Sequence, residues 1–141
     1  IYHVGEASSG HKIKLLNNVI HLSQFAAAAE AFTLAKEVGV SHETLFEIIN
    51  SGMAGSEFIE AKVGKALRGD FDAGDGFTID STCKDLKYAL EMADKVGFSM
   101  ATTASVKEVY TLATAVGEGQ KDYSVLFNVL PNVETGSKDV R

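Results

Sequence analysis

Proline is almost absent from this sequence, and that absence strongly limits the folds open to it. The only proline is residue 131 of 141, so no proline ring interrupts a helix before that point. Residues 26–31 are alanines apart from one glutamate, and alanine is the best helix former. Only the first four residues, IYHV, read as a strand. The pattern predicts an all-α fold with one long central helix and about five shorter helices packed around it.

The boundaries of these helices follow from local signals. Gly39 stands where a helix C-terminal glycine belongs, while Ser41 and Asp122 are suitable N-caps for the segments that follow them. Asp80 and Ser81 offer caps for the fourth segment. A loop rich in glycine and aspartate is expected between residues 68 and 77. The predicted helices span residues 10–38, 42–52, 57–67, 81–97, 103–119 and 123–130, and the first of them is expected to be buried centrally.

Composition excludes several classes of protein. Thirteen Lys and Arg face 19 Asp and Glu, and no basic block interrupts the net charge of -6, so we expect no nucleic-acid partner. The most apolar stretch, residues 13–35, carries too many polar residues for a membrane span. The single cysteine, Cys83, excludes an internal disulfide. The four histidines lack paired spacing, so we expect no metal site.

A phosphate-binding loop is the first candidate site. Gly5 and Gly10 have the G-x-x-x-x-G spacing, and IYHV precedes them as a strand would. However, His11 stands where the motif needs lysine, and Lys12 stands where it needs a hydroxyl. The motif mismatch argues against a phosphate loop.

A polar set at the start of the first helix is the second candidate. Lys14, Asn17, Asn18 and His21 are three, four and seven residues apart, which places them along one helix face. Their apolar neighbours are expected to be buried, and a lysine in such surroundings can have a lowered pKa and exchange a proton. Spacing alone favours another reading, in which the lysine extends to water and the asparagines cap or bridge helices.

The segment STCKDLKYA is the third candidate. Lys84 and Asp85 are expected in the first turn of the fourth helix, where the helix dipole favours the aspartate but not the lysine. The lysine therefore has some claim to a functional role. Cys83 beside it could be reactive at a helix N-terminus, although a small buried residue is the simpler interpretation.

Three motifs, in order, resemble the helical C-terminal domain of the β-hydroxyacid dehydrogenases, the family of 3-hydroxyisobutyrate dehydrogenase, to which 6-phosphogluconate dehydrogenase is a more distant relative. SSGHKIKLLNN is similar to the family pattern G-x-G-x-x-x-K-x-x-N-N, with Ser8 in place of the first glycine. GDGFTIDSTCKDLKYA resembles the F-x-x-x-x-x-x-K-D-L-x-x-A segment, and VYTLATAVGEGQKDYSVL resembles the closing Y-x-x-A-x-x-x-G-x-G-x-x-D stretch. The resemblance runs from about Tyr2 to Leu130 and implies a fold like the C-terminal domain of 6-phosphogluconate dehydrogenase.

The resemblance also implies a role for each matching residue. Lys14 matches the catalytic lysine, which exchanges a proton with the substrate hydroxyl while hydride passes to a nicotinamide. Asn18 matches the asparagine that holds the substrate near that lysine. Lys84 matches a lysine that contacts the cofactor, and Phe77 and Asp85 match positions that line the cofactor side of the cleft.

The implied activity is that of an NAD(P)-dependent oxidoreductase that interconverts a small 3-hydroxy acid and its semialdehyde or keto form. The family's dinucleotide fingerprint lies in an N-terminal Rossmann domain, which is expected to hold the phosphate and adenosine of NAD or NADP. Residues 1–9 resemble the last strand and turn of such a domain, 10–131 form the helical substrate and catalytic domain, and 132–141 are a loose tail. The missing start methionine fits a chain cut from a longer one.

Further expectations follow from the same resemblance. The helical domain alone should be inactive, should pair with its own Rossmann domain, and should form a homo-oligomer in the cytoplasm, or in the mitochondrial matrix of a eukaryote. A non-catalytic helical dimerisation or interaction module is the alternative.

Overall fold

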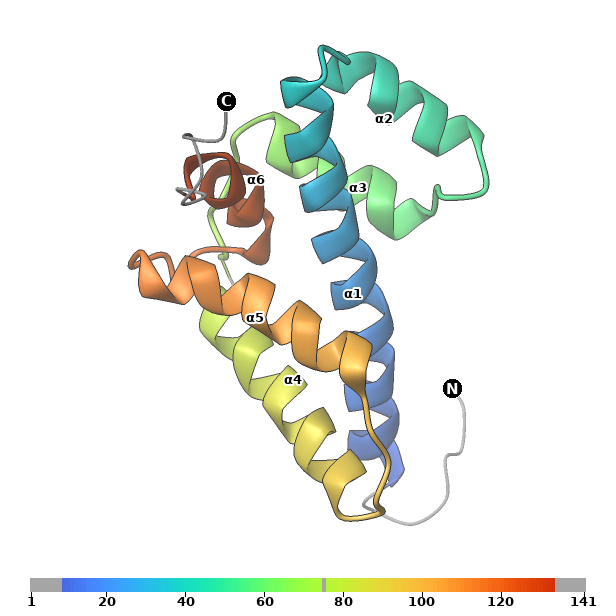
Figure 1. The fold of residues 1–141 in the computed structure, drawn as a ribbon, viewed down its shortest axis with the longest axis vertical. Coiled ribbons are helices and arrows are strands. Elements are labelled where there is room, and N and C mark those ends of the chain that lie inside the picture. Colours follow the sequence, from blue (N-terminus) through green and yellow to red (C-terminus); the bar gives the residue numbers. More distant parts are fainter. Residues whose placement is uncertain (1–8, 75, 134–141) are drawn as a thin grey trace, which may run out of the picture.

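The structure, a computed structural model, describes residues 9–74 and 76–133 and confirms the all-α prediction. Within these residues there are six α-helices and no strand (Figure 1). Two 3₁₀ turns flank the last helix. The helices are α1 (Ser9–Glu37), α2 (His42–Ser51), α3 (Glu57–Leu67), α4 (Ile79–Asp94), α5 (Ala101–Ala115) and α6 (Leu126–Val129), and the 3₁₀ turns are η1 (Tyr123–Val125) and η2 (Leu130–Asn132).

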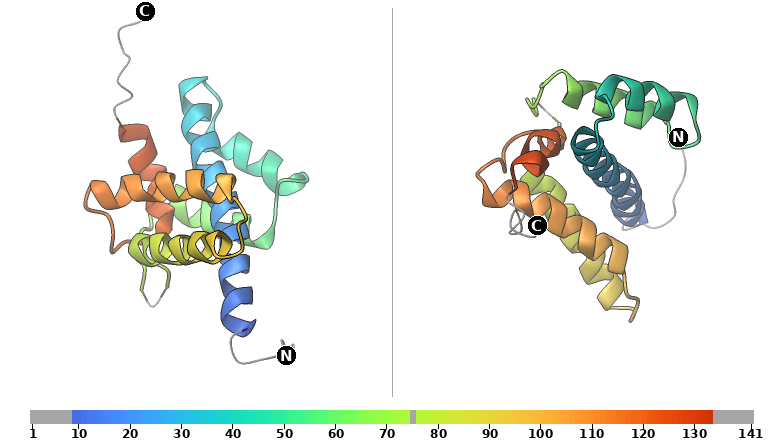
Figure 2. Two further views of the ribbon diagram at one scale, coloured as in Figure 1. Left: turned by 60° about the horizontal axis from the view of Figure 1, so that its bottom comes forward. Right: turned by 45° about the horizontal axis from the view of Figure 1, so that its top comes forward.

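The long helix α1 is the axis around which the other elements are arranged. The hairpin of α4 and α5 lies against one side of α1, and α2 with α3 lies on another side (Figures 1 and 2). The short helix α6 packs against α1 and α5 (Figure 1). No helix in the described part of the chain is long and apolar enough to cross a membrane.

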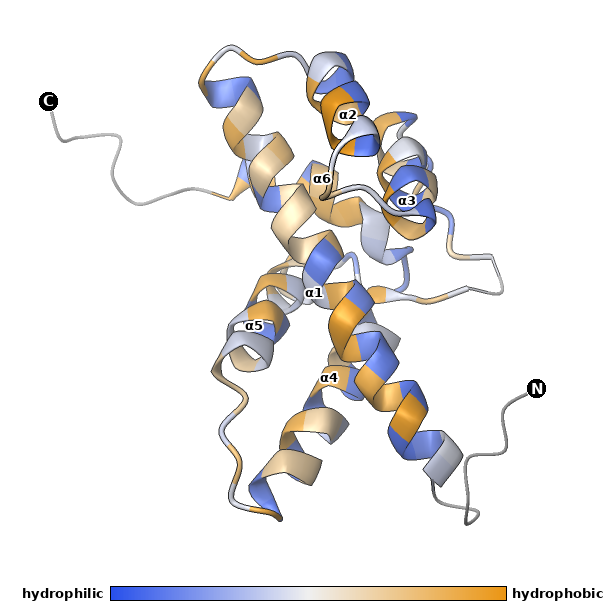
Figure 3. Cartoon of the chain, turned by 90° about the vertical axis from the view of Figure 1, so that its right-hand side faces the viewer, coloured by the Kyte–Doolittle hydropathy of each residue, from blue (hydrophilic) through white to orange (hydrophobic). Residues whose placement is uncertain are grey.

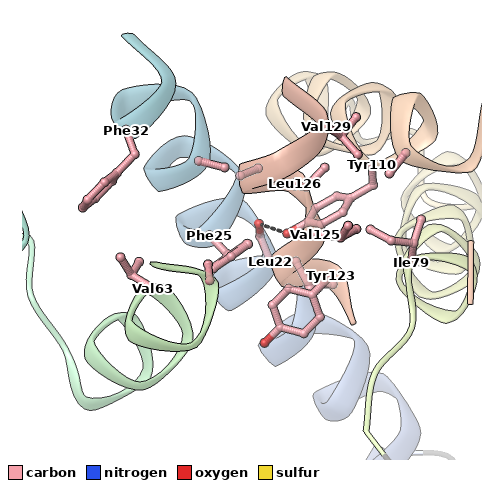
Figure 4. Packing of buried hydrophobic residues seen from close by; sticks show 14 of the residues in the cluster. Leu22, Phe25, Phe32, Val63, Ile79, Tyr110, Tyr123, Val125, Leu126 and Val129 are labelled. Atoms are coloured by element: carbon pink, nitrogen blue, oxygen red, sulfur yellow. Dashed lines mark hydrogen bonds between the residues drawn. The ribbon is translucent and has the colours of Figure 1, made fainter. Parts of the chain in front are cut away.

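The core joins α1 to the C-terminal turns. Phe25 of α1 packs edge-on against Tyr123, with ring centroids 5.1 Å apart, and Phe32 lies 5.2 Å from Phe127. Figure 4 shows Phe25 and Tyr123 close together beside α1, with Phe32 further along the same helix. The hydroxyl of Tyr110 donates to the carbonyl of Leu22 at 2.8 Å, so a buried polar group of α5 is satisfied by the backbone of α1. Burial raises the pKa of Tyr110 well above its usual value.

The expectation that the first helix is buried centrally holds for only one face of α1. Leu15, Leu22 and Phe25 are buried, but Ile13 and Ile20 on the opposite face are exposed. Figure 3 shows apolar segments of α1 on a side that no other helix covers. The reason is that helices pack on only part of the circumference of α1, whereas its sequence is apolar around most of it.

Helix boundaries agree with the local signals at most positions. Helix α3 has the predicted bounds, Ser41 caps α2, and Gly39 adopts the left-handed conformation expected of a C-terminal glycine, with φ of 78°. The cap of α4 is Thr78, whose hydroxyl accepts from the backbone N–H of Ser81. Asp80 and Ser81, the predicted caps, therefore lie inside the helix.

The C-terminal segment anchors the start of α4. The backbone N–H groups of Ile79 and Asp80 donate to the carbonyls of Lys121 and Gly119, each at 2.9 Å. The first turn of a helix has no internal acceptor for such groups, so the loop after α5 satisfies them. A side chain at Gly119 would collide with the Asp80 carboxylate, which explains the glycine there.

Asp122 stabilises the junction between the loop after α5 and the start of α4. Its side chain caps η1 through the N–H of Ser124, as predicted, and its Oδ2 accepts from Lys62 at 3.2 Å and lies 3.5 Å from Lys65. The predicted continuous helix after Asp122 is instead two 3₁₀ turns around α6, with Pro131 inside the second. These contacts fix the position at which the loop ends at Phe77 and α4 begins.

Several sequence expectations lie outside the described residues. These are the IYHV strand, most of the phosphate-loop candidate with Ser8, and the tail from residue 134 onward. Within the described part, Gly10, His11 and Lys12 belong to the first turn of α1.

Candidate active site

Lys14 lies on the second turn of α1 and is exposed. Its ammonium lies 5.8 Å from the centroid of the Phe77 ring, within the distance at which a cation is attracted to an aromatic face. The predicted burial of its surroundings is wrong, since Ile13, Leu16 and Ile20 are exposed and only Leu15 among the flanking residues is buried. The chain thus presents Lys14 beside an aromatic ring at an open surface.

Asn18, one turn further along α1, is turned into the molecule. Its Nδ2 donates to Oδ2 of Asp85 at 2.8 Å, and only 5% of Asn18 and 7% of Asp85 are exposed. Because an ionised carboxylate only accepts hydrogen bonds, it orients the amide so that the NH₂ group faces α4. This bond joins α1 to α4 across 67 residues of sequence.

Phe77 and Lys84 reach the region from the other side of the junction. Phe77 is half-buried in the segment just before α4, and Lys84 is exposed on α4. Since Thr78 caps the helix, Lys84 and Asp85 lie in its second turn, and the prediction of a first-turn position is wrong. The helix dipole consequently does not explain Asp85.

The structure therefore brings together four of the five predicted site residues, two by two. Lys14 lies over Phe77, and Asn18 bonds to Asp85, with the two pairs linked by the single turn of α1 between Lys14 and Asn18. Lys84 adjoins Asp85 in sequence, but within the described residues its side chain makes no hydrogen bond, ion pair or cation–π contact with the other four. No three His, Cys, Asp or Glu side chains of residues 9–74 and 76–133 are grouped to hold a metal ion.

The pairing of Asn18 with Asp85 was missed at the level of sequence, although a signal existed. Leu86, Ala89 and Ala93 mark the buried face of α4, and Asp85 falls on that face. An aspartate on an apolar helix face needs a partner, which α1 supplies.

His21 continues the polar face of α1 toward α3. It is half-buried, and its ring centroid lies 5.0 Å from that of Phe58. Burial lowers the pKa of His21, and the charge of Lys62 lowers it further, while a hydrogen bond to the backbone of Asn17 acts in the opposite direction. His21 is thereby favoured in its neutral form.

A surface hollow of about 470 Å³ lies elsewhere, at the turn between α4 and α5. Leu90, Phe98 and Met100 help to line it, and none of the predicted site residues does. It lacks converging polar groups apart from Asp94 and Ser99, so the chemistry points instead to Lys14.

The types of side chain near Lys14 suit the binding of a nicotinamide cofactor. The Phe77 ring offers a flat apolar surface, and Lys14 and Lys84 are exposed cations suited to an anionic substrate and to a phosphorylated ribose.

Comparison with known proteins identifies the family. The family described as "NAD-binding of NADP-dependent 3-hydroxyisobutyrate dehydrogenase" matches residues 8–130. The chain belongs to this family of NAD(P)-dependent hydroxyacid dehydrogenases, as its three motifs predict, and NAD(P) is the cofactor of the family.

Individual relatives show the degree of sequence identity and the share of each protein that the chain covers. The chain is 36% identical over 130 residues to 2-(hydroxymethyl)glutarate dehydrogenase of Eubacterium barkeri, covering 92% of this chain and 42% of that protein. It is 32% identical over 126 residues to the cytokine-like nuclear factor N-PAC of Homo sapiens, covering 89% of this chain and 22% of that protein.

A solved structure of 3-hydroxyisobutyrate dehydrogenase from Salmonella typhimurium shares the fold. Its TM-score is 0.83 at 22% identity, over 91% of this chain and 45% of that one. The chain thus spans less than half the length of each of these proteins.

Proposed function

We propose that this chain is the C-terminal substrate and catalytic domain of an NAD(P)-dependent oxidoreductase that interconverts a small 3-hydroxy acid and its semialdehyde or keto form. The observation that carries the proposal is the arrangement on α1, where exposed Lys14 precedes by one turn an Asn18 whose amide is held by Asp85. A mobile proton-transfer group beside a fixed hydrogen-bonding group suits a small polar substrate.

Lys14 is the proposed acid and base. In the oxidative direction its neutral amine accepts the proton of the substrate hydroxyl and becomes an ammonium, as the hydride leaves the same carbon. In the reductive direction the ammonium returns that proton to the carbonyl oxygen. Its side chain is free to reach a substrate because the surrounding face of α1 is exposed.

Asn18 is the proposed substrate-binding group, and Asp85 its positioning residue. Asp85 accepts one N–H of the amide, which leaves the second N–H and the carbonyl oxygen of Asn18 for a substrate. A fixed amide loses little conformational freedom on binding. This assigns Asp85 a role through Asn18, rather than the direct cofactor contact that the family resemblance implies.

Phe77 and Lys84 are the proposed cofactor contacts of this chain. NAD(P), when bound, accepts or supplies the hydride. Phe77 would present its ring to the flat nicotinamide beside Lys14, and exposed Lys84 would supply a positive charge. The phosphates and adenosine would be held by a Rossmann domain that joins the helical domain (residues 10–131) through residues 1–9.

The names of two relatives narrow the substrate class. 3-Hydroxyisobutyrate and 2-(hydroxymethyl)glutarate both carry a hydroxymethyl group beside a carboxylate-bearing carbon. We therefore propose a 2-substituted 3-hydroxypropanoate as substrate. Its hydroxyl would meet Lys14, and Asn18 would hold the molecule through a neighbouring polar group.

Turnover by a protein that joins this chain to a dinucleotide-binding domain tests the proposal. With such 3-hydroxy acids and either cofactor, Lys14→Ala should lower kcat by roughly 10²–10⁴-fold, the usual contribution of general acid–base catalysis. Small alkylamines added to the buffer should restore part of the activity, because they replace the missing amine.

Lys36→Ala is the matched control, since it removes an exposed lysine from the far end of the same helix. It should leave turnover unchanged, and the 141-residue chain alone should show none. Near-normal kcat in Lys14→Ala would refute the catalytic assignment.

A second candidate, a non-catalytic interaction module, is favoured by one observation. The chain resembles N-PAC almost as closely as it resembles a dehydrogenase, and the name N-PAC describes a nuclear factor. The domain therefore also occurs in a protein whose name states no enzymatic activity. Absence of turnover and of cofactor binding in the joined protein, together with stable self-association, would favour this role.

A further inference from the structure

His21 lies on the same face of α1 as the proposed catalytic pair. At about 100° per residue, Lys14, Asn18 and His21 fall within about 60° of one another around the helix. Side chains of a helix lean toward its N-terminus and cover the preceding turn, so the ring of His21 covers the turn that holds Asn17 and Asn18. A hydrogen bond from the ring to the backbone of Asn17 agrees with that placement. His21 therefore borders the space in which Asn18 would hold a substrate.

Helix α3 closes the other side of this space. The ring of Phe58 lies 5.0 Å from the ring of His21, measured between centroids, and the two planes are inclined by 54°. Both residues are half-buried. The imidazole is thus held between two helices, while part of it remains accessible to a small molecule.

The ring of His21 offers a hydrogen-bond acceptor. Burial and the charge of Lys62 favour its neutral form, which carries a single N–H. The bond to the backbone of Asn17 raises the pKa of His21, which means that the ring donates and the carbonyl oxygen accepts. The N–H of the neutral ring is therefore used within the protein, and the second nitrogen has only its lone pair to offer.

Lys62 limits which donor can approach that lone pair. Its ammonium lies near enough to lower the pKa of His21, and it is held by Asp122 at 3.2 Å and by the ring of Tyr123, whose centroid is 4.6 Å away. Because Lys65 shares the same carboxylate, the cluster keeps a positive charge. A cationic donor would be repelled by this charge, whereas a neutral hydroxyl would not.

We propose that His21 determines which substituent the substrate carries on C2, and that it selects a hydroxyl group. This rests on the proposed function, in which the C3 hydroxyl gives its proton to Lys14 while hydride passes from C3 to NAD(P). The C2 hydroxyl donates to the second nitrogen of His21. A methyl group leaves that acceptor without a partner, and an ammonium group meets the positive charge of Lys62. The substrate class is therefore 2,3-dihydroxypropanoate and related acids with a hydroxyl on C2.

The spacing along α1 suits a molecule with hydroxyls on neighbouring carbons. Lys14 and His21 are seven residues apart, about 10 Å along the helix axis, and Asn18 lies between them. The ring of His21 leans back toward Asn18, and the exposed side chain of Lys14 is long and flexible enough to cover much of the remaining distance.

Three acids that differ only at C2 test the proposal: 2,3-dihydroxypropanoate, 3-hydroxy-2-methylpropanoate and 2-amino-3-hydroxypropanoate. The protein that joins this chain to a dinucleotide-binding domain should have its highest kcat/KM on the first. His21→Leu should lower the ratio of kcat/KM for the hydroxyl acid to that for the methyl acid roughly 10-fold, the effect of one lost hydrogen bond. This ratio does not depend on how much of a variant is folded. A wild type that prefers the methyl acid, or an unchanged ratio in His21→Leu, would overturn the proposal.

Gln24→Leu is the matched control, because it makes the same polar-to-apolar change almost one turn further from Lys14. It should leave the ratio unchanged, and an equal fall in this variant would contradict the role of His21. His21→Gln should restore part of the preference, since its side-chain carbonyl is again an acceptor. Lys62→Gln should raise kcat/KM for the ammonium acid several-fold relative to the hydroxyl acid.

A direct binding measurement separates this inference from the proposed function. Absence of turnover on all three acids would refute the proposed function, and binding would then decide the role of His21. With ¹⁵N-labelled histidine in the same joined protein, millimolar 2,3-dihydroxypropanoate should shift the NMR signal of the unprotonated ring nitrogen of His21 toward that of a hydrogen-bonded nitrogen. The methyl acid should not, and Lys14→Ala should keep the shift. No shift with the dihydroxy acid, or an equal shift with both acids, would overturn the proposal.

Discussion

Two buried aspartates, Asp122 and Asp85, each join two elements of the fold: Asp122 joins η1 to α3, and Asp85 joins α4 to α1. Asp122 is 1% exposed and is surrounded by compensating groups, the ammonium groups of Lys62 and Lys65 and the backbone N–H of Ser124. Asp85 is 7% exposed, and its hydrogen bond with another side chain is to the neutral amide of Asn18. The Asp122 carboxylate is therefore paired with positive charges, whereas the Asp85 side chain is paired with a neutral hydrogen-bond donor.

This difference distinguishes the structural junction at Asp122 from the candidate active site at Asp85. A carboxylate with cations and a helix cap holds three segments in place and leaves little to react with a ligand. A carboxylate that fixes a buried amide one turn of α1 from an exposed lysine leaves that amide with further hydrogen-bonding capacity near the lysine. The ring of Phe77 lies between the two regions, just before the capped start of α4.

Removing the charge-matched carboxylate should have the largest effect. Asp122→Ala loses the cap of η1 and leaves Lys62 and Lys65 without their partner, and we expect a loss of about 2–4 kcal/mol in unfolding free energy, measured by urea denaturation. A loss below about 1 kcal/mol would show that the junction contributes little.

The same aspartate should make stability depend on pH. Burial alone raises the pKa of Asp122, but hydrogen bonds from Ser124 and the charge of Lys62 outweigh burial and lower it. The native state therefore binds the proton less readily than the unfolded chain, and this contribution is present above the unfolded-state pKa of about 3.9. It should be lost as the pH falls through the lower native value, and Asp122→Asn should lack this part of the acid dependence.

A double-mutant cycle on Asn18 and Asp85 sharpens the comparison. Asn18→Ala leaves a buried carboxylate without its side-chain partner, so we expect about 1–3 kcal/mol of destabilisation. Adding Asp85→Ala should recover part of that loss, because the unpartnered charge is removed, and the coupling energy should reach about 1 kcal/mol.

The cycle on Lys62 and Asp122 is the reference for that coupling. Lys62→Ala leaves Lys65 to compensate the carboxylate, so its coupling energy should be smaller. Equal coupling in the two cycles would remove the distinction between the two aspartates.

Much of the fold could be predicted because its signals are local. Helix α3 and the caps at Ser41 and Asp122 depend on residues within one turn of each other. The start of α4 was missed by two residues because Thr78, Asp80 and Ser81 can all cap a helix. A contact with a distant segment decides among them, since the N–H groups of the first turn bond to the loop after α5.

The site was less accessible to sequence reasoning. The helical period places Lys14 and Asn18 one turn apart, but it cannot say that Asn18 turns inward to Asp85, which lies on another helix. The exposure of Ile13 and Ile20 was missed for a related reason: burial depends on which helices pack against α1, and the period alone does not contain that. The roles of Lys14, Asn18, Phe77, Lys84 and Asp85 stay predictions.

The smallest expected effect concerns His21, which lies between the two regions because it follows Asn18 on α1 and is near Lys62. Its titration midpoint, measured by NMR, should lie below the usual value of about 6.5, since burial and then the charge of Lys62 lower its pKa. Lys62→Gln should raise the midpoint without bringing it to the usual value, because burial remains the larger cause. A midpoint at or above 6.5 in the wild type would contradict this.

Linkage gives the corresponding effect on stability. Between the native pKa of His21 and about 6.5, the unfolded chain binds more protons than the native one, so this contribution to stability declines as the pH falls through that window. Lys62→Gln should narrow the window, and His21→Gln should abolish it. If both variants kept the wild-type dependence of unfolding free energy on pH near pH 6, His21 would not contribute to that dependence. The charge of Lys62, which pairs with Asp122, would then have no effect on stability through His21.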